Sequence, residues 1–300
     1  MSSPFEGAQP PRDRAELEAG DAPATGEISP LTSMGAVHLT VADLGRSLDY
    51  YRTAIGLEVL AEGDGQASLG AGGRELLVLH EEPGARPALG YTGLFHLALL
   101  LPERADLARW LAHAARDRVP LSGLSDHYVS EALYLSDPDA HGIEIYADRP
   151  REVWEGQVGG RMTTEPLDVE DLLSELDDPA TEPFDGLPAG TTMGHVHLRV
   201  SSIPETVAFY RDRLGFALTA EYGSQAAFLA AGGYHHHVGA NTWQSAGAPP
   251  PPADTAALRS VSIVVPDETE RDRVLVRVDA DDGTVVDPSG NRLVFEVAAQ

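Results

Sequence analysis

The side chains in this sequence that are best suited to chemistry are histidines and carboxylates. The 300-residue chain has 11 histidines and no cysteine, so it forms no disulfide and offers no thiolate to a metal. Any metal ion must therefore be held by imidazole nitrogens and carboxylate oxygens. Two histidine motifs are candidates for such a role: His195-Val196-His197 and His235-His236-His237.

Strand geometry limits what these motifs can do. Successive side chains of a β-strand point to opposite faces of the sheet. On a strand, either His235 and His237 together or His236 alone would face a given site. The same rule places His195 and His197 on one face, where they compete for a single role.

The charge of the chain excludes some partners. There are 47 acidic residues against 21 basic ones, all of them arginine, and the net charge is −26. Such a surface repels phosphate backbones, so we expect no nucleic-acid partner. This composition suits either a high-salt cytoplasm, where ions screen the repulsion, or a GC-rich genome that favours arginine over lysine.

Length and hydropathy indicate a two-domain protein. With 300 residues, of which 42% are hydrophobic, the chain can bury a sizeable core. It contains no apolar run of 18 residues, so we expect no membrane-spanning segment. The N-terminus lacks a signal pattern, which favours the cytoplasm. The sequence leaves open whether the chain forms a homo-oligomer.

The chain repeats itself, which is the signature of tandem structural units. Met34-Gly35-Ala36-Val37-His38-Leu39 returns as Met193-Gly194-His195-Val196-His197-Leu198, at an offset of 193 − 34 = 159. The further matches are Tyr51-Arg52 with Tyr210-Arg211, Gly56 with Gly215, and Asp137-Pro138 with Asp287-Pro288.

Each copy has the pattern of a strand, a helix and further strands. Alternation from Val37 to Val41 predicts a strand, and apolar residues at helical spacing from Leu44 to Ile55 predict a helix that Gly56 ends. The elements expected next are strands near 66–69, 75–80 and 94–99 and a helix around 104–116. Each domain therefore contains two βαβββ modules.

Several stretches between residues 34 and 297 carry a family resemblance. They include His195-Val196-His197-Leu198, Phe95-His96-Leu97-Ala98, Asp137-Pro138-Asp139-Ala140-His141-Gly142-Ile143-Glu144 and Gly232-Gly233-Tyr234-His235-His236-His237. This pattern resembles the vicinal oxygen chelate superfamily, which includes glyoxalase I, bleomycin-resistance proteins and extradiol dioxygenases. More closely, it is similar to the two-domain catechol 2,3-dioxygenases.

The resemblance implies an α+β fold with tandem βαβββ modules in two glyoxalase-like domains. The expected divisions are a disordered acidic and proline-rich tail (1–30), a first vicinal oxygen chelate domain (31–150), an acidic linker (151–189) and a second such domain (190–300).

The resemblance also implies one metal site shared by both domains. In this superfamily a domain offers ligands on its first and fifth strands and a carboxylate on its eighth. Those positions read Ala36, His96 and Glu144 in the first domain and His195, Ser260 and Val294 in the second. Only a crossed combination, His96 with Glu144 and His195, is complete, which implies that the domains exchange halves. We favour His195 over His197 from the register with Met193-Gly194.

Two alternatives at these positions stay open. His38 and Glu296 share faces with Ala36 and Val294, so a degenerate second site remains a hypothesis. A lone histidine on a strand is also often a structural residue. For His96 and Glu144, it is only their position in the family pattern that favours metal binding over a structural role.

Further catalytic candidates follow from the same resemblance. Tyr134 is placed to hydrogen-bond a substrate hydroxyl, with a packed core tyrosine as the alternative. One residue of the triple run is expected to be an acid–base histidine, and we favour His236 over His237. His127 is either a further cavity residue or an ordinary loop residue.

The resemblance therefore implies an extradiol ring-cleaving dioxygenase. It would use Fe²⁺, with Mn²⁺ as the alternative, and act on a catechol and O₂. A glyoxalase-type isomerase or lyase would usually need a fourth ligand such as glutamate, which the triple-histidine strand lacks. A metal-free binding protein is the third hypothesis, and the single complete ligand set argues against it.

Overall fold

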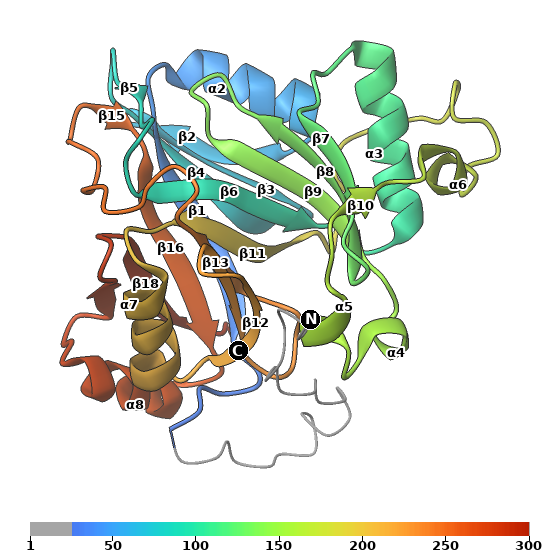
Figure 1. Ribbon diagram of the computed structural model, residues 1–300. Coiled ribbons are helices and arrows are strands. Elements are labelled where there is room, and N and C mark those ends of the chain that lie inside the picture. The colour runs from blue at the N-terminus through green and yellow to red at the C-terminus, as the bar shows by residue number, and fades with distance from the viewer. Residues whose placement is uncertain (1–25, 300) are drawn as a thin grey trace.

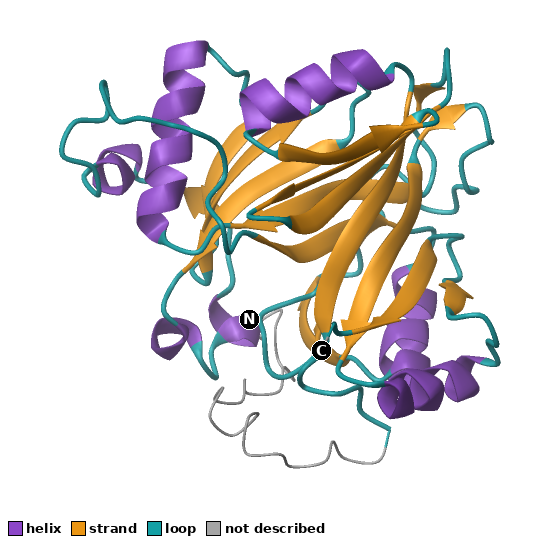
Figure 2. Ribbon diagram, turned by 180° about the vertical axis from the view of Figure 1, so that it is seen from behind, coloured by secondary structure: helices purple, strands orange, loops and turns teal. Residues whose placement is uncertain are grey.

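The structure, a computed structural model, describes residues 26–299. Two large curved sheets form its centre, and most helices lie on their outer sides (Figure 1, Figure 2). The chain forms four successive modules, two on either side of a segment of short elements. The predicted α+β fold of tandem modules is confirmed.

The first half of the chain contains two modules of four strands and one helical segment. The first consists of β1 (Ser33–Val41), α2 (Leu44–Tyr50), the π-helix η1 (Tyr51–Ile55), β2 (Glu58–Gly63), β3 (Gln66–Ala71) and β4 (Arg74–Glu81). The second consists of β6 (Gly93–Leu100), α3 (Arg104–Asp117), β7 (Gly123–Asp126), β8 (Ser130–Ser136) and β9 (Gly142–Asp148).

The second half repeats this plan with one difference. The third module consists of β11 (Thr192–Arg199), α7 (Ile203–Val207), the π-helix η2 (Ala208–Leu214), β12 (Ala217–Tyr222), β13 (Ala226–Ala230) and β14 (Val238–Asn241). The fourth consists of β16 (Leu258–Val265), α8 (Glu268–Val278), β17 (Thr284–Val286) and β18 (Arg292–Val297). Within residues 26–299 the fourth module therefore has three strands where each of the others has four.

Short elements connect the modules. Between the halves lie α4 (Arg151–Trp154), α5 (Val158–Arg161), β10 (Glu165–Pro166) and α6 (Val169–Leu173). A separate two-stranded pair joins β5 (Arg86–Pro87) to β15 (Thr255–Ala256).

The same local chemistry sets the first helix of both halves. The Asp43 side chain accepts a hydrogen bond from the Arg46 N–H at the start of α2, and Ser202 accepts one from Glu205 at the start of α7. Both helical segments end at a glycine with positive φ, Gly56 at 91° and Gly215 at 93°. These caps explain why the sequence pattern predicted the helix ends.

The sheets join modules from different halves of the chain. The nine-stranded sheet has the order β10-β7-β8-β9-β6-β11-β14-β13-β12, so the second and third modules meet where β6 pairs with β11. The seven-stranded sheet has the order β17-β18-β16-β1-β4-β3-β2, so the first and fourth modules meet where β1 pairs with β16. The exchange of halves that the crossed ligand set implied is confirmed.

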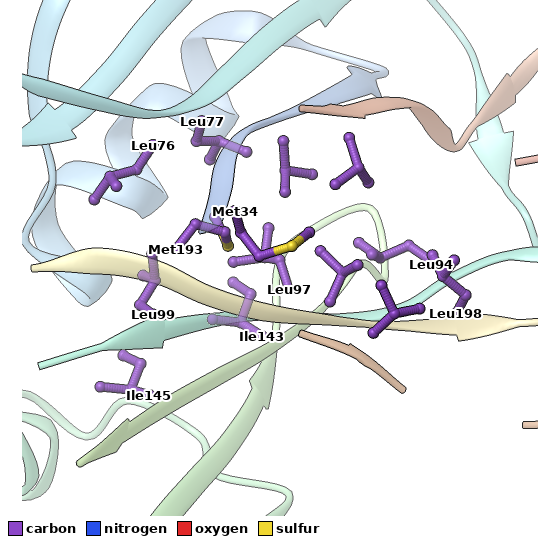
Figure 3. Packing of buried hydrophobic residues seen from close by; sticks show 14 of the residues in the cluster. Met34, Leu76, Leu77, Leu94, Leu97, Leu99, Ile143, Ile145, Met193 and Leu198 are labelled. Carbon is purple, nitrogen blue, oxygen red and sulfur yellow. The ribbon is translucent and has the colours of Figure 1, made fainter. Parts of the chain in front are cut away.

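One hydrophobic cluster connects the two sheets. Figure 3 shows part of it, with Met34 and Leu77 from the seven-stranded sheet and Met193, Leu97 and Ile143 from the nine-stranded sheet. Since strand side chains alternate, the neighbours of Leu97 and Ile143 face the other side of their sheet. That other face carries the candidate site.

The segments predicted to be tail and linker contain packed residues. Residues 1–25 of the predicted tail lie outside the described residues. Ile28 is buried and its N–H donates to the Gly215 carbonyl, so the fold begins before the predicted boundary at residue 30. In the predicted linker, Trp154 and Leu172 are buried and β10 extends the nine-stranded sheet. No helix of the described chain is long and apolar enough to cross a membrane.

Candidate metal centre

Three neighbouring strands bring the proposed ligands together. His96 lies on β6, Glu144 on β9 and His195 on β11. Ala98 of the central strand pairs with Glu144 on one side and with His195 on the other. The three side chains therefore project from the same face of the sheet, at neighbouring positions on adjacent strands.

The ligand atoms lie close to one another in a buried cluster. Nε2 of His96 lies 3.0 Å from Oε2 of Glu144, and Nε2 of His195 lies 3.1 Å from the same oxygen. The three residues are buried, with relative exposures of 6%, 2% and 2%. Among the residues that the structure describes, this is the one group of three or more histidine, aspartate or glutamate side chains whose ligand atoms lie within 4.8 Å of one another.

The chemistry of this donor set suits a divalent cation. Burial raises the pKa of Glu144, but His195 and His96 outweigh that effect and hold the pKa of this carboxyl well below its ordinary value. Burial lowers the pKa of His195, which favours the neutral ring that metal ligation requires. Nδ1 of His195 has no hydrogen-bond partner. An anionic carboxylate between two imidazoles is a set that a bound cation would complete.

The complementary positions on the seven-stranded sheet form no such set. They hold Ala36, Ser260 and Val294. The two residues that left a degenerate site open have other partners: His38 lies 3.2 Å from a ring nitrogen of His80, and Glu296 accepts a hydrogen bond from Ser262.

A cavity of about 440 Å³ opens over the ligand set. Its lining includes all three proposed ligands and three of the four further candidates, namely Tyr134, His127 and His236. His237 does not line it; its Nδ1 accepts a hydrogen bond from the backbone of Ala231. The structure therefore brings His236, and not His237, to the candidate site.

Tyr134 and His127 form a hydrogen-bonded pair at the cavity wall. Nδ1 of His127 lies 2.7 Å from the carbonyl oxygen of Thr163, which can only accept, so this nitrogen carries the hydrogen. Nε2 of His127 then accepts from the hydroxyl of Tyr134 at 2.7 Å. Burial and the nearby Glu144 carboxylate raise the pKa of Tyr134 well above its ordinary value, so it stays a neutral phenol.

The triple-histidine run does not lie on a strand, contrary to the prediction. It precedes β14, which begins at Val238. Alternation therefore does not apply, and the side chains of His235 and His236 point toward each other with their Nδ1 atoms 2.8 Å apart. Nε2 of His235 lies 2.9 Å from a carboxylate oxygen of Asp148. A chain of hydrogen bonds thus runs from Asp148 through His235 to His236.

The comparisons with known proteins identify the family. A model described as the Glyoxalase/Bleomycin resistance protein/Dioxygenase superfamily matches residues 33–145 and 192–295, which is most of the chain. The chain belongs to this superfamily. It is 46% identical over 253 residues to a protein of Bacillus subtilis (strain 168) named catechol-2,3-dioxygenase, covering 82% of this chain and 87% of that one.

Solved structures share the fold of this superfamily member. A putative dioxygenase from Bacillus subtilis subsp. subtilis str. 168 superposes with a TM-score of 0.58 at 14% identity, covering 89% of this chain and 86% of that one. Glyoxalase I from Zea mays superposes with a TM-score of 0.53 at 16% identity, covering 88% and 92%. At these identities the likeness shows the common fold alone.

Sequence reasoning missed Asp148 and left His197 as a competitor only. The sequence pattern could have identified Asp148, because Glu144, Tyr146 and Asp148 alternate along β9 and share a face of the sheet. His197 lines the cavity, and its Nε2 has no hydrogen-bond partner. Its ring fits only because position 239 is glycine, where an added Cβ would lie 2.9 Å from the imidazole.

Proposed function

We propose that this superfamily member is an extradiol dioxygenase that cleaves a catechol ring beside its two hydroxyls with O₂. The observation that carries the proposal is the buried set of His96, Glu144 and His195 at the floor of a cavity. Two imidazoles and one carboxylate on one face leave the remaining coordination positions for substrate and O₂. The 46% identity to a protein named catechol-2,3-dioxygenase supports it.

We propose Fe²⁺ as the metal, with Mn²⁺ as the alternative. The chemistry that such an ion supplies when bound is Lewis-acid activation of both catechol hydroxyls and electron transfer between the ring and O₂. His96, Glu144 and His195 would hold it. A glyoxalase-type reaction is less well supported, because the described cluster contains one carboxylate and no fourth ligand.

His236 is proposed as the acid–base residue, and its hydrogen bonds define which nitrogen acts. The Asp148 carboxylate accepts from Nε2–H of His235, which leaves Nδ1 of a neutral His235 as an acceptor. His236 then donates its Nδ1–H to His235. Nε2 of His236 remains free to take a proton from a substrate hydroxyl and later return it to the ring-opening oxygen.

Tyr134 and His127, which also line the cavity, are proposed to orient the substrate. The Tyr134 hydroxyl donates to His127, so its oxygen lone pairs can accept from a catechol hydroxyl. Because Thr163 holds His127 in one tautomer, the direction of this hydrogen bond is set before substrate binds.

Iron content and oxygen uptake test the proposal. Protein purified without air should bind one iron per chain, and addition of catechol with O₂ should consume one O₂ per ring and form a yellow ring-fission product. Oxygen uptake is then compared after reconstitution with Fe²⁺, Mn²⁺ and Zn²⁺. Zn²⁺ serves as the control that is expected to be inactive. Stoichiometric iron binding without oxygen uptake on any catechol would contradict the assignment.

A further inference from the structure

The cavity extends beyond the ligand set along an aromatic wall. Phe95 and Trp243 meet edge to face with ring centroids 5.3 Å apart, and Phe95 lies 5.3 Å from the ring of His197. Phe228 also packs against His197, with ring centroids 5.7 Å apart. Tyr222 adds a fourth aromatic side chain to the lining.

This wall is open to the cavity and to solvent. Trp243 is 47% exposed and Tyr222 is 60% exposed. Neither residue belongs to the hydrophobic clusters of the described chain. Large apolar side chains exposed at the mouth of a cavity are typical of a ligand contact.

The lining offers no arginine to an anionic substituent. Of the 23 described residues that line the cavity, Glu144 is the one acidic residue and none is arginine. Arg149 pairs with Asp126 and Arg151 with Glu155, and Arg199 lines a separate small cavity. A carboxylate on the substrate would therefore lose its hydration without gaining a cation, close to the negative charge of Glu144.

The size of the cavity indicates that the ring is substituted. A volume of about 440 Å³ lies in the range that holds drug-sized ligands and exceeds what one unsubstituted ring fills. Apolar surface that packs on the aromatic wall contributes roughly 25 cal/mol per Å² buried.

We propose that the substrate is a catechol with an uncharged hydrocarbon substituent, and that Phe95, Phe228 and Trp243 form the subsite for that substituent. This inference rests on the proposed ring-cleaving function, because the position of the hydroxyls at the ligand set determines where the substituent lies.

Matched catechols test the charge and the size of the substituent. Catechol, 4-ethylcatechol, 3,4-dihydroxyphenylacetate and its methyl ester are compared on the iron-loaded protein. Dissociation constants come from calorimetry without oxygen, and kcat/KM values come from oxygen uptake. We expect 4-ethylcatechol to exceed catechol by about tenfold and the acetate by more, with the neutral ester close to 4-ethylcatechol.

The possible outcomes separate this inference from the function. Equal or better binding and cleavage of the acetate would overturn the inference and leave the ring-cleaving function intact. Failure of all four compounds to bind or be cleaved would overturn the function itself. An ester as poor as the acetate would show that size, and not charge, excludes it.

Two variants test the subsite. Trp243→Ala should lower the ratio of kcat/KM for 4-ethylcatechol over catechol. Trp243→Arg places a cation at an already exposed position, so the protein should still fold, and the ratio of 4-ethylcatechol over the acetate should fall about tenfold. Circular dichroism and iron content check both variants. Unchanged ratios in folded, iron-loaded variants would overturn the assignment of the subsite.

Discussion

The nine-stranded and seven-stranded sheets place different side chains at equivalent positions. Tyr134 pairs with Glu144 between β8 and β9, and Thr284 pairs with Val294 between β17 and β18. The strand pairing is the same, but one sheet presents a phenol and a carboxylate where the other presents a hydroxyl and an isopropyl group.

A turn shared by both sheets shows what the fold itself requires. Asp137 accepts hydrogen bonds from the N–H groups of Asp139 and His141, and Asp287 accepts from those of Ser289 and Asn291. Both carboxylates also accept from a buried tyrosine. The aspartate turn is present in both sheets and the proposed ligand set in one, which supports a role of the turn in the fold and of the proposed ligand set in the chemistry.

The largest effect is expected from removal of the carboxylate ligand. Glu144→Gln keeps the volume but removes the charge that a divalent cation needs, so metal affinity should fall by more than about 100-fold, since loss of a residue that only supports a ligand already costs 10–100-fold. Metal content after dialysis measures it. The matched control is Val294→Ala on the other sheet, which should keep one metal per chain. Two metals per chain in the unmodified protein would contradict the proposal that only the nine-stranded sheet binds metal.

A large effect on turnover is expected at His236. His236→Ala should keep iron and catechol binding but lower kcat by roughly 10²–10⁴-fold, because the proton acceptor is lost. The control is Glu75→Ala. Glu75 lies on the seven-stranded sheet and lines a second cavity there, so this change should leave kcat unchanged. Loss of iron in His236→Ala would reassign it as a ligand. A His237→Ala variant that alone abolishes turnover would show that the wrong histidine was chosen.

A smaller effect is expected at Asp148, which lies 2.9 Å from His235 and is proposed to act through it. Asp148→Asn should lower kcat roughly tenfold, less than the loss at His236, with little change in KM, because the amide no longer holds His235 as an acceptor for His236. The pH profile of kcat should shift as well, which a purely structural role would not cause. A KM increase at constant kcat would argue instead for a role in substrate binding.

The smallest effects concern the two aspartate turns and appear as opposite pH dependences of stability. Burial raises the pKa of Asp137, but the hydrogen bond and charge of His141 outweigh it and leave the pKa below its ordinary value. Its contribution is therefore present above the ordinary value of about 3.9 and is lost as the pH falls through the lowered pKa. Burial raises the pKa of Asp287 above its ordinary value, so its contribution is present at low pH and is lost as the pH rises through the raised pKa.

Urea unfolding of the metal-free protein between pH 3 and pH 7 measures this contrast. Asp137→Asn should cost about 1.5–3 kcal/mol at neutral pH and less in acid. The cost of Asp287→Asn should instead shrink as the pH rises. Parallel pH dependences for the two variants would show that His141 and Asn291 do not distinguish the turns.

The sequence by itself determined the modules, their order and the identity of the ligand candidates. The repeat at offset 159 indicates the tandem plan. The alternation in β1 and the glycine after each first helix are local signals, and local signals suffice for strands and helix ends. The crossed pattern of Ala36 and His195 even implied that the halves exchange, because a complete ligand set requires it.

Only the tertiary structure decided what lies around those ligands. His236 rather than His237 reaches the cavity because the run lies in a loop, and loop side chains follow no period that a sequence shows. The hydrogen-bond chain to Asp148 and the wall of Phe95, Phe228 and Trp243 join residues up to about 150 positions apart in the chain. Their proximity depends on which strands pair between modules, and strand pairing is a property of the folded chain rather than of any local stretch of it.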